Sequence, residues 1–76
     1  MSKAYLIIFS HNKKIAKIDA YLDRNKAVNA WSLLATAQSA REGFRKDDPN
    51  NFSVVDADMF GHSRLMQWQF KQTEVK

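Results

Sequence analysis

The sequence predicts an α+β fold, in which an antiparallel sheet of about four strands and one helix form a two-layer sandwich in the order β-β-α-β-β. Three observations favour this class. A continuous apolar run opens the chain, a long alanine-rich segment without glycine or proline follows it, and two strand-like segments return after a turn-rich stretch. A chain of 76 residues cannot bury two separate cores. We therefore expect a single domain over residues 1–76.

The first two strands are expected to form a hairpin. Ala4–Phe9 is a short apolar run rich in β-branched and aromatic residues, which is typical of a buried strand. Residues 10–14 are polar, and Asn12 suits the left-handed conformation of a tight turn. Residues 15–23 fit a strand by alternation, and they also fit a helix with an apolar stripe. We favour the strand, because a short turn after a strong strand usually makes a hairpin.

The helix is expected from Arg24 to about Arg41, with Asp23 as its N-cap. Apolar residues recur on one face of this segment, which is typical of a helix that packs on a core. We expect Gly43 to end the helix. Residues 45–51 are expected to form a loop, because they combine aspartates and asparagines with the only proline of the chain.

Two further strands are expected after this loop. Phe52–Ala57 is apolar and β-branched, and Arg64–Lys71 alternates large apolar residues with glutamines, which indicates a half-buried strand. The two are joined by a connection that contains Gly61. Residues 72–76 are polar, and we expect them to fray.

Composition narrows the classes of protein that the chain can belong to. The net charge of +4 comes from scattered basic residues, and it allows either nucleic acid or an acidic protein as a partner. The absence of cysteine excludes disulfides and thiolate metal sites and fits a reducing compartment. No run approaches the roughly 20 apolar residues that span a bilayer, and no signal-peptide pattern is present. We expect a cytoplasmic protein with no membrane partner.

Candidate residues for chemistry are few. Asp56, Asp58 and His62 could form a hard-metal or acid–base cluster, which makes a small metal-dependent hydrolase an alternative. The signal is weak, because Asp-x-Asp is common by chance and acidic residues often form turns. The chain has no glycine-rich phosphate loop and no Gly-x-Ser-x-Gly elbow. We therefore expect no enzymatic activity, no catalytic residue, no bound metal and no cofactor.

The first strand gives the main indication of function, because it is apolar on both faces. Tyr5, Ile7 and Phe9 point to one side, and Leu6 and Ile8 point to the other. A single helix covers one set, and the other set faces the open side of the sheet. Apolar groups on an uncovered face usually mark a contact surface. The sequence does not decide which set the helix covers.

We expect the partner-binding residues to be apolar anchors surrounded by basic side chains. The expected residues are Tyr5, Ile7, Phe9, Tyr21, Lys13, Lys14, Lys17, Arg41 and Arg45. The leading interpretation is a protein-binding module. Because aromatic and basic residues would share this surface, a single-stranded nucleic-acid-binding protein is an alternative. A homodimer that covers its own open face is a further alternative.

This arrangement resembles small proteins that phages and other mobile elements encode to block host machinery, such as anti-CRISPR proteins and phage inhibitors of bacterial RNA polymerase. The resemblance covers the hairpin from Tyr5 to Leu22, the helix from Asn25 to Ala40 and the strand from Phe52 to Ala57. It is architectural, so no site residue is carried over from it. It implies a non-enzymatic inhibitor that blocks a host machine, such as a CRISPR effector or a polymerase, by steric occlusion.

Overall fold

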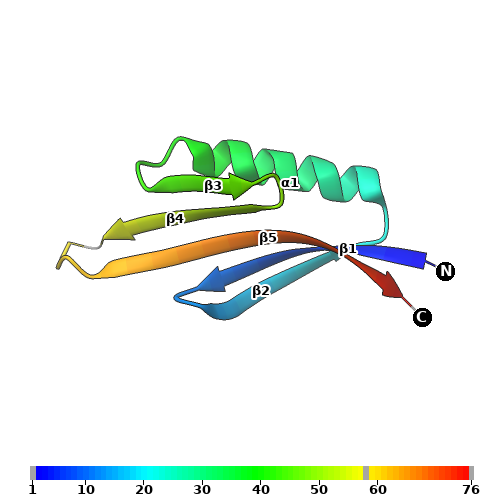
Figure 1. The fold of residues 1–76 in the computed structure, drawn as a ribbon, viewed down its shortest axis with the longest axis horizontal. Coiled ribbons are helices and arrows are strands. Elements are labelled where there is room, and N and C mark those ends of the chain that lie inside the picture. Colours follow the sequence, from blue (N-terminus) through cyan, green and yellow to red (C-terminus); the bar gives the residue numbers. More distant parts are fainter. Residues whose placement is uncertain (1, 58, 76) are drawn as a thin grey trace.

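The computed structural model describes residues 2–57 and 59–75, which form one five-stranded antiparallel sheet and one helix (Figure 1). The elements in chain order are β1 (Ser2–His11), β2 (Lys14–Tyr21), α1 (Arg24–Ser39), β3 (Phe44–Asp48), β4 (Asn51–Ala57) and β5 (Ser63–Val75). The predicted α+β class is therefore confirmed, with one more strand than expected.

The strands lie in the order β2-β1-β5-β4-β3. The first and last strands of the chain are thus neighbours near the middle of the sheet, and β2 and β3 are its two edges. Because α1 lies in the chain between β2 and β3, the connection that contains it joins the two edges of the sheet across one face. Figure 1 shows the helix running nearly along the strand direction, with the two ends of the chain together at one end of the molecule.

The β1–β2 hairpin confirms the predicted turn and the preference for a strand over residues 15–23. Asn12 and Lys13 both have positive φ, at 51° and 70°, which is the conformation of a two-residue turn whose twist matches the flanking strands. His11 faces Lys14 across this turn, and the register shifts once, between Phe9 and Ser10. Beyond this shift the pairing is regular, and Tyr5 faces Tyr21. This pairing determines which β2 side chains lie on each face of the sheet.

The helix begins as expected but ends earlier. Asp23 caps it, because the Asp23 carboxylate accepts hydrogen bonds from the backbone N–H groups of Asn25 at 2.8 Å and Lys26 at 3.3 Å. The C-cap is Ala40, so the helix does not reach Arg41. Gly43 does not end it and has another role.

Gly43 marks a close approach of two backbone segments. A Cβ atom at this position would lie 1.8 Å from the carbonyl oxygen of Val55. The Gly43 carbonyl also accepts a hydrogen bond from the Val55 N–H at 3.2 Å. The residue is glycine because β4 leaves no room for a side chain here.

The prediction of a loop over residues 45–51 is wrong, because most of it is strand β3 and the turn into β4. Arg45 faces Ser53 and Lys46 faces Phe52. Asp48 closes the turn by accepting hydrogen bonds from the Asn50 N–H at 2.7 Å and from the Asn51 side-chain amide at 3.2 Å. The strand is mostly exposed and charged at the edge of the sheet, so it lacks the apolar alternation by which strands are predicted.

The prediction of a frayed tail over residues 72–76 is also wrong as far as the structure describes it, and Lys76 lies outside the described residues. β5 continues to Val75, and Gln72 to Val75 face Tyr5 to Ser2 of β1. Polar side chains do not prevent this pairing, because the backbone groups supply the hydrogen bonds.

The core lies between α1 and the sheet and is mainly aromatic. Trp31 of the helix packs against Phe52 and Phe70, with ring centroids 4.8 and 5.6 Å apart. Its indole N–H donates a hydrogen bond to the Pro49 carbonyl at 3.0 Å, which ties the helix to the β3–β4 turn. Phe52 stacks on Trp68 with a centroid distance of 5.1 Å. Aromatic pairs of this kind contribute about 0.5–1.5 kcal/mol beyond their burial.

Candidate protein-binding surface

The helix covers the aromatic side of β1, so the side chains expected to be apolar anchors lie in the core between the helix and the sheet. Tyr5 and Ile7 are only 8% and 5% exposed, and Phe9 and Tyr21 are half-buried against the same core. The physical reason is volume, because a helix sits far enough from a sheet for large aromatic rings to be needed between them. None of these four side chains is presented on the open face of the sheet.

The open face carries the other set of β1 side chains, together with the β2 side chains that are paired with them. Leu6 faces Ala20, Ile8 faces Ile18, and Ser10 faces Ile15. We call Leu6, Ile8, Ile15, Ile18 and Ala20 the aliphatic surface. Ile8 is buried, because it lies on a central strand between neighbours, whereas Ile15 and Ile18 at the edge are 64% and 52% exposed.

The sequence predicts two apolar faces of β1 but does not indicate which of them the helix covers. The alternation along β1 places Leu6 and Ile8 opposite Tyr5, Ile7 and Phe9. The available signal was side-chain size, because the bulkier aromatic set is the one that fills the space under a helix. The exposure of Ile15 could not be foreseen, because it depends on the register shift in the hairpin.

The β4–β5 part of the open face is mainly polar, with one apolar pair, Val55 opposite Leu65. Asn51 faces Gln69 and Ser53 faces Gln67 across β4 and β5. These side chains border a hollow of about 240 Å³ together with Asp47. Most of the apolar area on the open face therefore lies in the β1–β2 half of the sheet, and Val55, which is 45% exposed, adds a smaller apolar area on β4.

The basic residues expected around the anchors are distributed over different parts of the molecule. Lys13 and Lys14 lie in the hairpin next to Ile15. Lys71, which was not among the expected site residues, faces Leu6 on the open side. Lys17 faces Phe9 and so lies on the helix side of the sheet, and Arg45 lies on β3 at the far edge.

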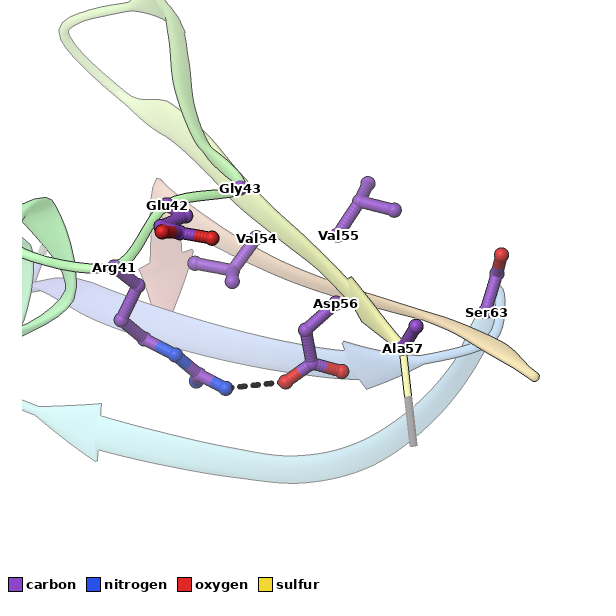
Figure 2. A pocket seen from close by; sticks show the side chains of 8 residues that line it. All are labelled: Arg41, Glu42, Gly43, Val54, Val55, Asp56, Ala57 and Ser63. Carbon is purple, nitrogen blue, oxygen red and sulfur yellow. Dashed lines mark hydrogen bonds and ion pairs between the residues drawn. The ribbon is translucent and has the colours of Figure 1, made fainter. Parts of the chain in front are cut away.

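Arg41 is held in an ion-pair cluster past the end of the helix (Figure 2). Its Nη2 lies 2.5 Å from Asp56 Oδ2, and Arg64 Nε lies 3.0 Å from Asp56 Oδ1. Arg41 also donates to the Gln38 side-chain oxygen at 3.1 Å. Arg41 and Asp56 border a hollow of about 640 Å³ that is also lined by Glu42 and Ser63. Because its lining contains one arginine and two acidic residues, Glu42 and Asp56, this hollow is not a basic site.

The residues considered for chemistry do not form a described cluster. Both carboxylate oxygens of Asp56 are already bonded to arginines. His62 is exposed in the connection between β4 and β5, and Asp58 lies outside the described residues. Within residues 2–57 and 59–75, no three histidine, cysteine or acidic side chains are grouped so that they could hold a metal ion.

The nine aromatic residues are absent from the open face. Phe60 lies in the β4–β5 connection, 6.4 Å from the His62 ring. The others lie on the helix or on the sheet side that it covers: Tyr5, Phe9, Tyr21, Trp31, Phe44, Phe52, Trp68 and Phe70. Nucleobases bind single-strand proteins largely by stacking on aromatic rings. The open face therefore lacks a stacking platform.

In the part of the chain that the structure describes, no helix has both the length and the apolar character needed to cross a membrane. Compared with protein-family models, with curated proteins and with solved structures, the chain matches none of them.

Proposed function

We propose that this chain is a non-enzymatic protein-binding module that binds a protein partner with its aliphatic surface. The observation that carries the proposal is the exposure of Ile15 and Ile18 beside Leu6 on the face opposite the helix. Contiguous apolar side chains on an uncovered sheet face are the usual sign of a contact surface. Burying exposed isoleucines would contribute roughly 25 cal/mol per Å² of apolar area removed from water.

The charges around this surface define the chemistry of the partner. Lys71 lies on the open face opposite Leu6, Lys13 lies in the turn that precedes Ile15, and the whole chain carries a net charge of +4. We infer a protein partner that presents an apolar patch with acidic residues around it. Complementary charges of this kind chiefly raise the association rate and select the partner.

The proposal includes inhibition by steric occlusion in the cytoplasm. The architectural resemblance to mobile-element inhibitors supports this part, because those proteins also block a host machine without chemistry. Single-stranded nucleic-acid binding is less well supported, since it would have to rely on lysines and arginines without aromatic stacking on the open face.

The test compares two variants in affinity capture. The double variant Ile15→Asp, Ile18→Asp places charges in the aliphatic surface, whereas Leu33→Asp changes a side chain that is 73% exposed on the helix. We expect a captured partner to be retained by the parent chain and by Leu33→Asp and to be lost by the double variant. With the purified partner, calorimetry should give at least about a tenfold weaker affinity for the double variant, which corresponds to 1.4 kcal/mol.

Two results would contradict the proposal. One is equal binding of the purified partner by the parent and by a double variant whose circular dichroism spectrum is unchanged. The other is binding of labelled single-stranded oligonucleotides at near-physiological salt with a clear salt dependence and no protein partner, which would favour the nucleic-acid alternative.

A further inference from the structure

β2 is an unpaired edge of the sheet. An edge strand presents backbone N–H and C=O groups that can pair with another strand, and proteins usually protect such edges with charges or irregularities. Here the register shift affects only the turn end of β2, and the pairing with β1 is regular from Lys17 to Tyr21. Lys17, Ile18 and Ala20 are exposed in this regular stretch, and Ile18, at 52%, is the large apolar side chain among them. Lys17 protects the edge only against a strand that does not place an acidic residue opposite it.

The sequence of β2 is complementary to itself in one antiparallel register. When two identical edges pair around a two-fold axis normal to the sheet, each side chain stays on its own face, so the axis must pass through a residue. An axis through Ile18 places Ile18 opposite Ile18 of the second copy. It also places Lys17 opposite Asp19 of the second copy, and this pair occurs twice by symmetry.

The registers centred one residue to either side of Ile18 are less favourable. An axis through Lys17 or through Asp19 would place two like charges directly opposite one another, which is destabilising in a sheet. The register through Ile18 instead gives an apolar pair and two opposite-charge pairs. Lys17 Nζ lies 3.7 Å from Asp19 Oδ2 within one chain, so both side chains lie on the same side of the strand, and both are partly exposed to solvent at the edge.

The opposite edge does not have this property. On β3, an axis through Lys46 or through Asp47 would again place like charges opposite one another. The pairing of β3 with β4 is also irregular between Lys46 and Asp48. Of the two edges, β2 is therefore the one that suits a second copy.

We propose that two copies of this chain associate through β2, edge to edge, in the register centred on Ile18. The two sheets then form one continuous sheet of twice the width. On the open face, the two aliphatic surfaces become neighbours, because Ile18 lies opposite Ile18 of the second copy. On the helix side, Lys17 and Asp19 of each copy bind their counterparts in the other. This inference goes beyond the proposed function and does not depend on it.

The test uses two charge reversals, Lys17→Asp and Asp19→Lys. In homodimers, each variant would place like charges opposite one another twice. A mixture of the two variants would instead restore two opposite-charge pairs. By sedimentation velocity over a concentration series, we expect the parent chain to dimerise, each variant alone to be monomeric at concentrations at least tenfold higher, and the mixture to form heterodimers.

A matched control separates this register from net charge. Lys14→Asp makes the same charge change as Lys17→Asp but lies outside the Lys17–Asp19 pairing, so we expect it to dimerise like the parent. Circular dichroism of each variant checks that the fold is kept. A parent chain that stays monomeric up to millimolar concentration, or a mixture that associates no better than its components, would overturn the proposal.

A second measurement tests directly which residues of the two β2 strands lie opposite each other. The natural chain has no cysteine, so Ile18→Cys provides a single thiol at the proposed axis. Residues directly opposite in antiparallel strands are close enough for a disulfide. We expect rapid oxidation of Ile18→Cys to a covalent dimer and slow oxidation of Arg45→Cys on the other edge. Equal rates for the two would contradict the register. None of these measurements involves the partner protein, so this proposal and the proposed function can fail separately.

Discussion

At the scale of single residues, Gly43 shows how a steric constraint can be mistaken for a helix signal. The sequence places it just after an alanine-rich helix, where glycine commonly ends the helix. In the structure the helix has already ended at Ser39. Gly43 is required because its backbone lies against that of Val55. Such a contact between segments distant in sequence leaves no local pattern by which it could be predicted.

The first prediction concerns the two glycines of the chain. Gly43→Ala would place Cβ 1.8 Å from a backbone oxygen that cannot move without disturbing β4. We predict a loss of about 3 kcal/mol or more in the free energy of unfolding, as for severe overpacking. Gly61→Ala meets no atom within 4 Å and is strained only by its φ of +82°, so it should cost about 1 kcal/mol. Urea denaturation of both variants provides the comparison, and equal losses would contradict this explanation.

At the scale of elements, the structure confirms the segments whose sequence signals are local. Ala4–Phe9 has the composition of a buried strand, and Asp23 is followed by a helix as its capping chemistry requires. The strand β3 and the end of β5 were missed for one physical reason. Their side chains are polar and exposed, and only backbone pairing with a neighbouring strand makes them strands.

The second prediction tests the helix start. The Asp23 carboxylate accepts hydrogen bonds from two backbone N–H groups that have no partner within the helix. We predict that Asp23→Ala lowers the free energy of unfolding by about 1 kcal/mol, whereas Asp23→Asn, which keeps an acceptor oxygen, costs only a few tenths. Thermal unfolding followed by circular dichroism at 222 nm measures both. Equal midpoints for the alanine and asparagine variants would show that capping does not explain the helix start.

At the scale of the whole molecule, the sequence could not assign the two faces of β1. Both sets of side chains are apolar, and the choice depends on where α1 lies after crossing from β2 to β3. The candidate site therefore contains Ile15 and Ile18, which are exposed on the open face, in place of Tyr5 and Phe9. The protein-binding hypothesis keeps its physical basis, because one apolar set of β1 still faces away from the helix.

The third prediction concerns residues 72–76, the segment expected to fray. Gln72 to Val75 pair with the start of β1, where Ala4 and Tyr5 are buried. Deletion of residues 72–76 should therefore lower the free energy of unfolding by about 3 kcal/mol, from lost burial and lost backbone pairing. As a control, Thr73→Ala with Glu74→Ala keeps the backbone and should cost less than about 1 kcal/mol. A deletion that costs no more than this control would show that the pairing contributes little.

The central position of β1 and β5 has a consequence for how the chain acquires its structure. β1 pairs with β5 along its whole length, yet nearly the entire chain lies between the two strands. Closing so long a loop is entropically costly before any contact compensates for it, and folds dominated by such distant contacts form slowly. During synthesis, the β1–β2 hairpin and the helix leave the ribosome before β5 does. Until then β1 has one unpaired edge and two apolar faces, so the nascent chain is most prone to aggregation in this interval.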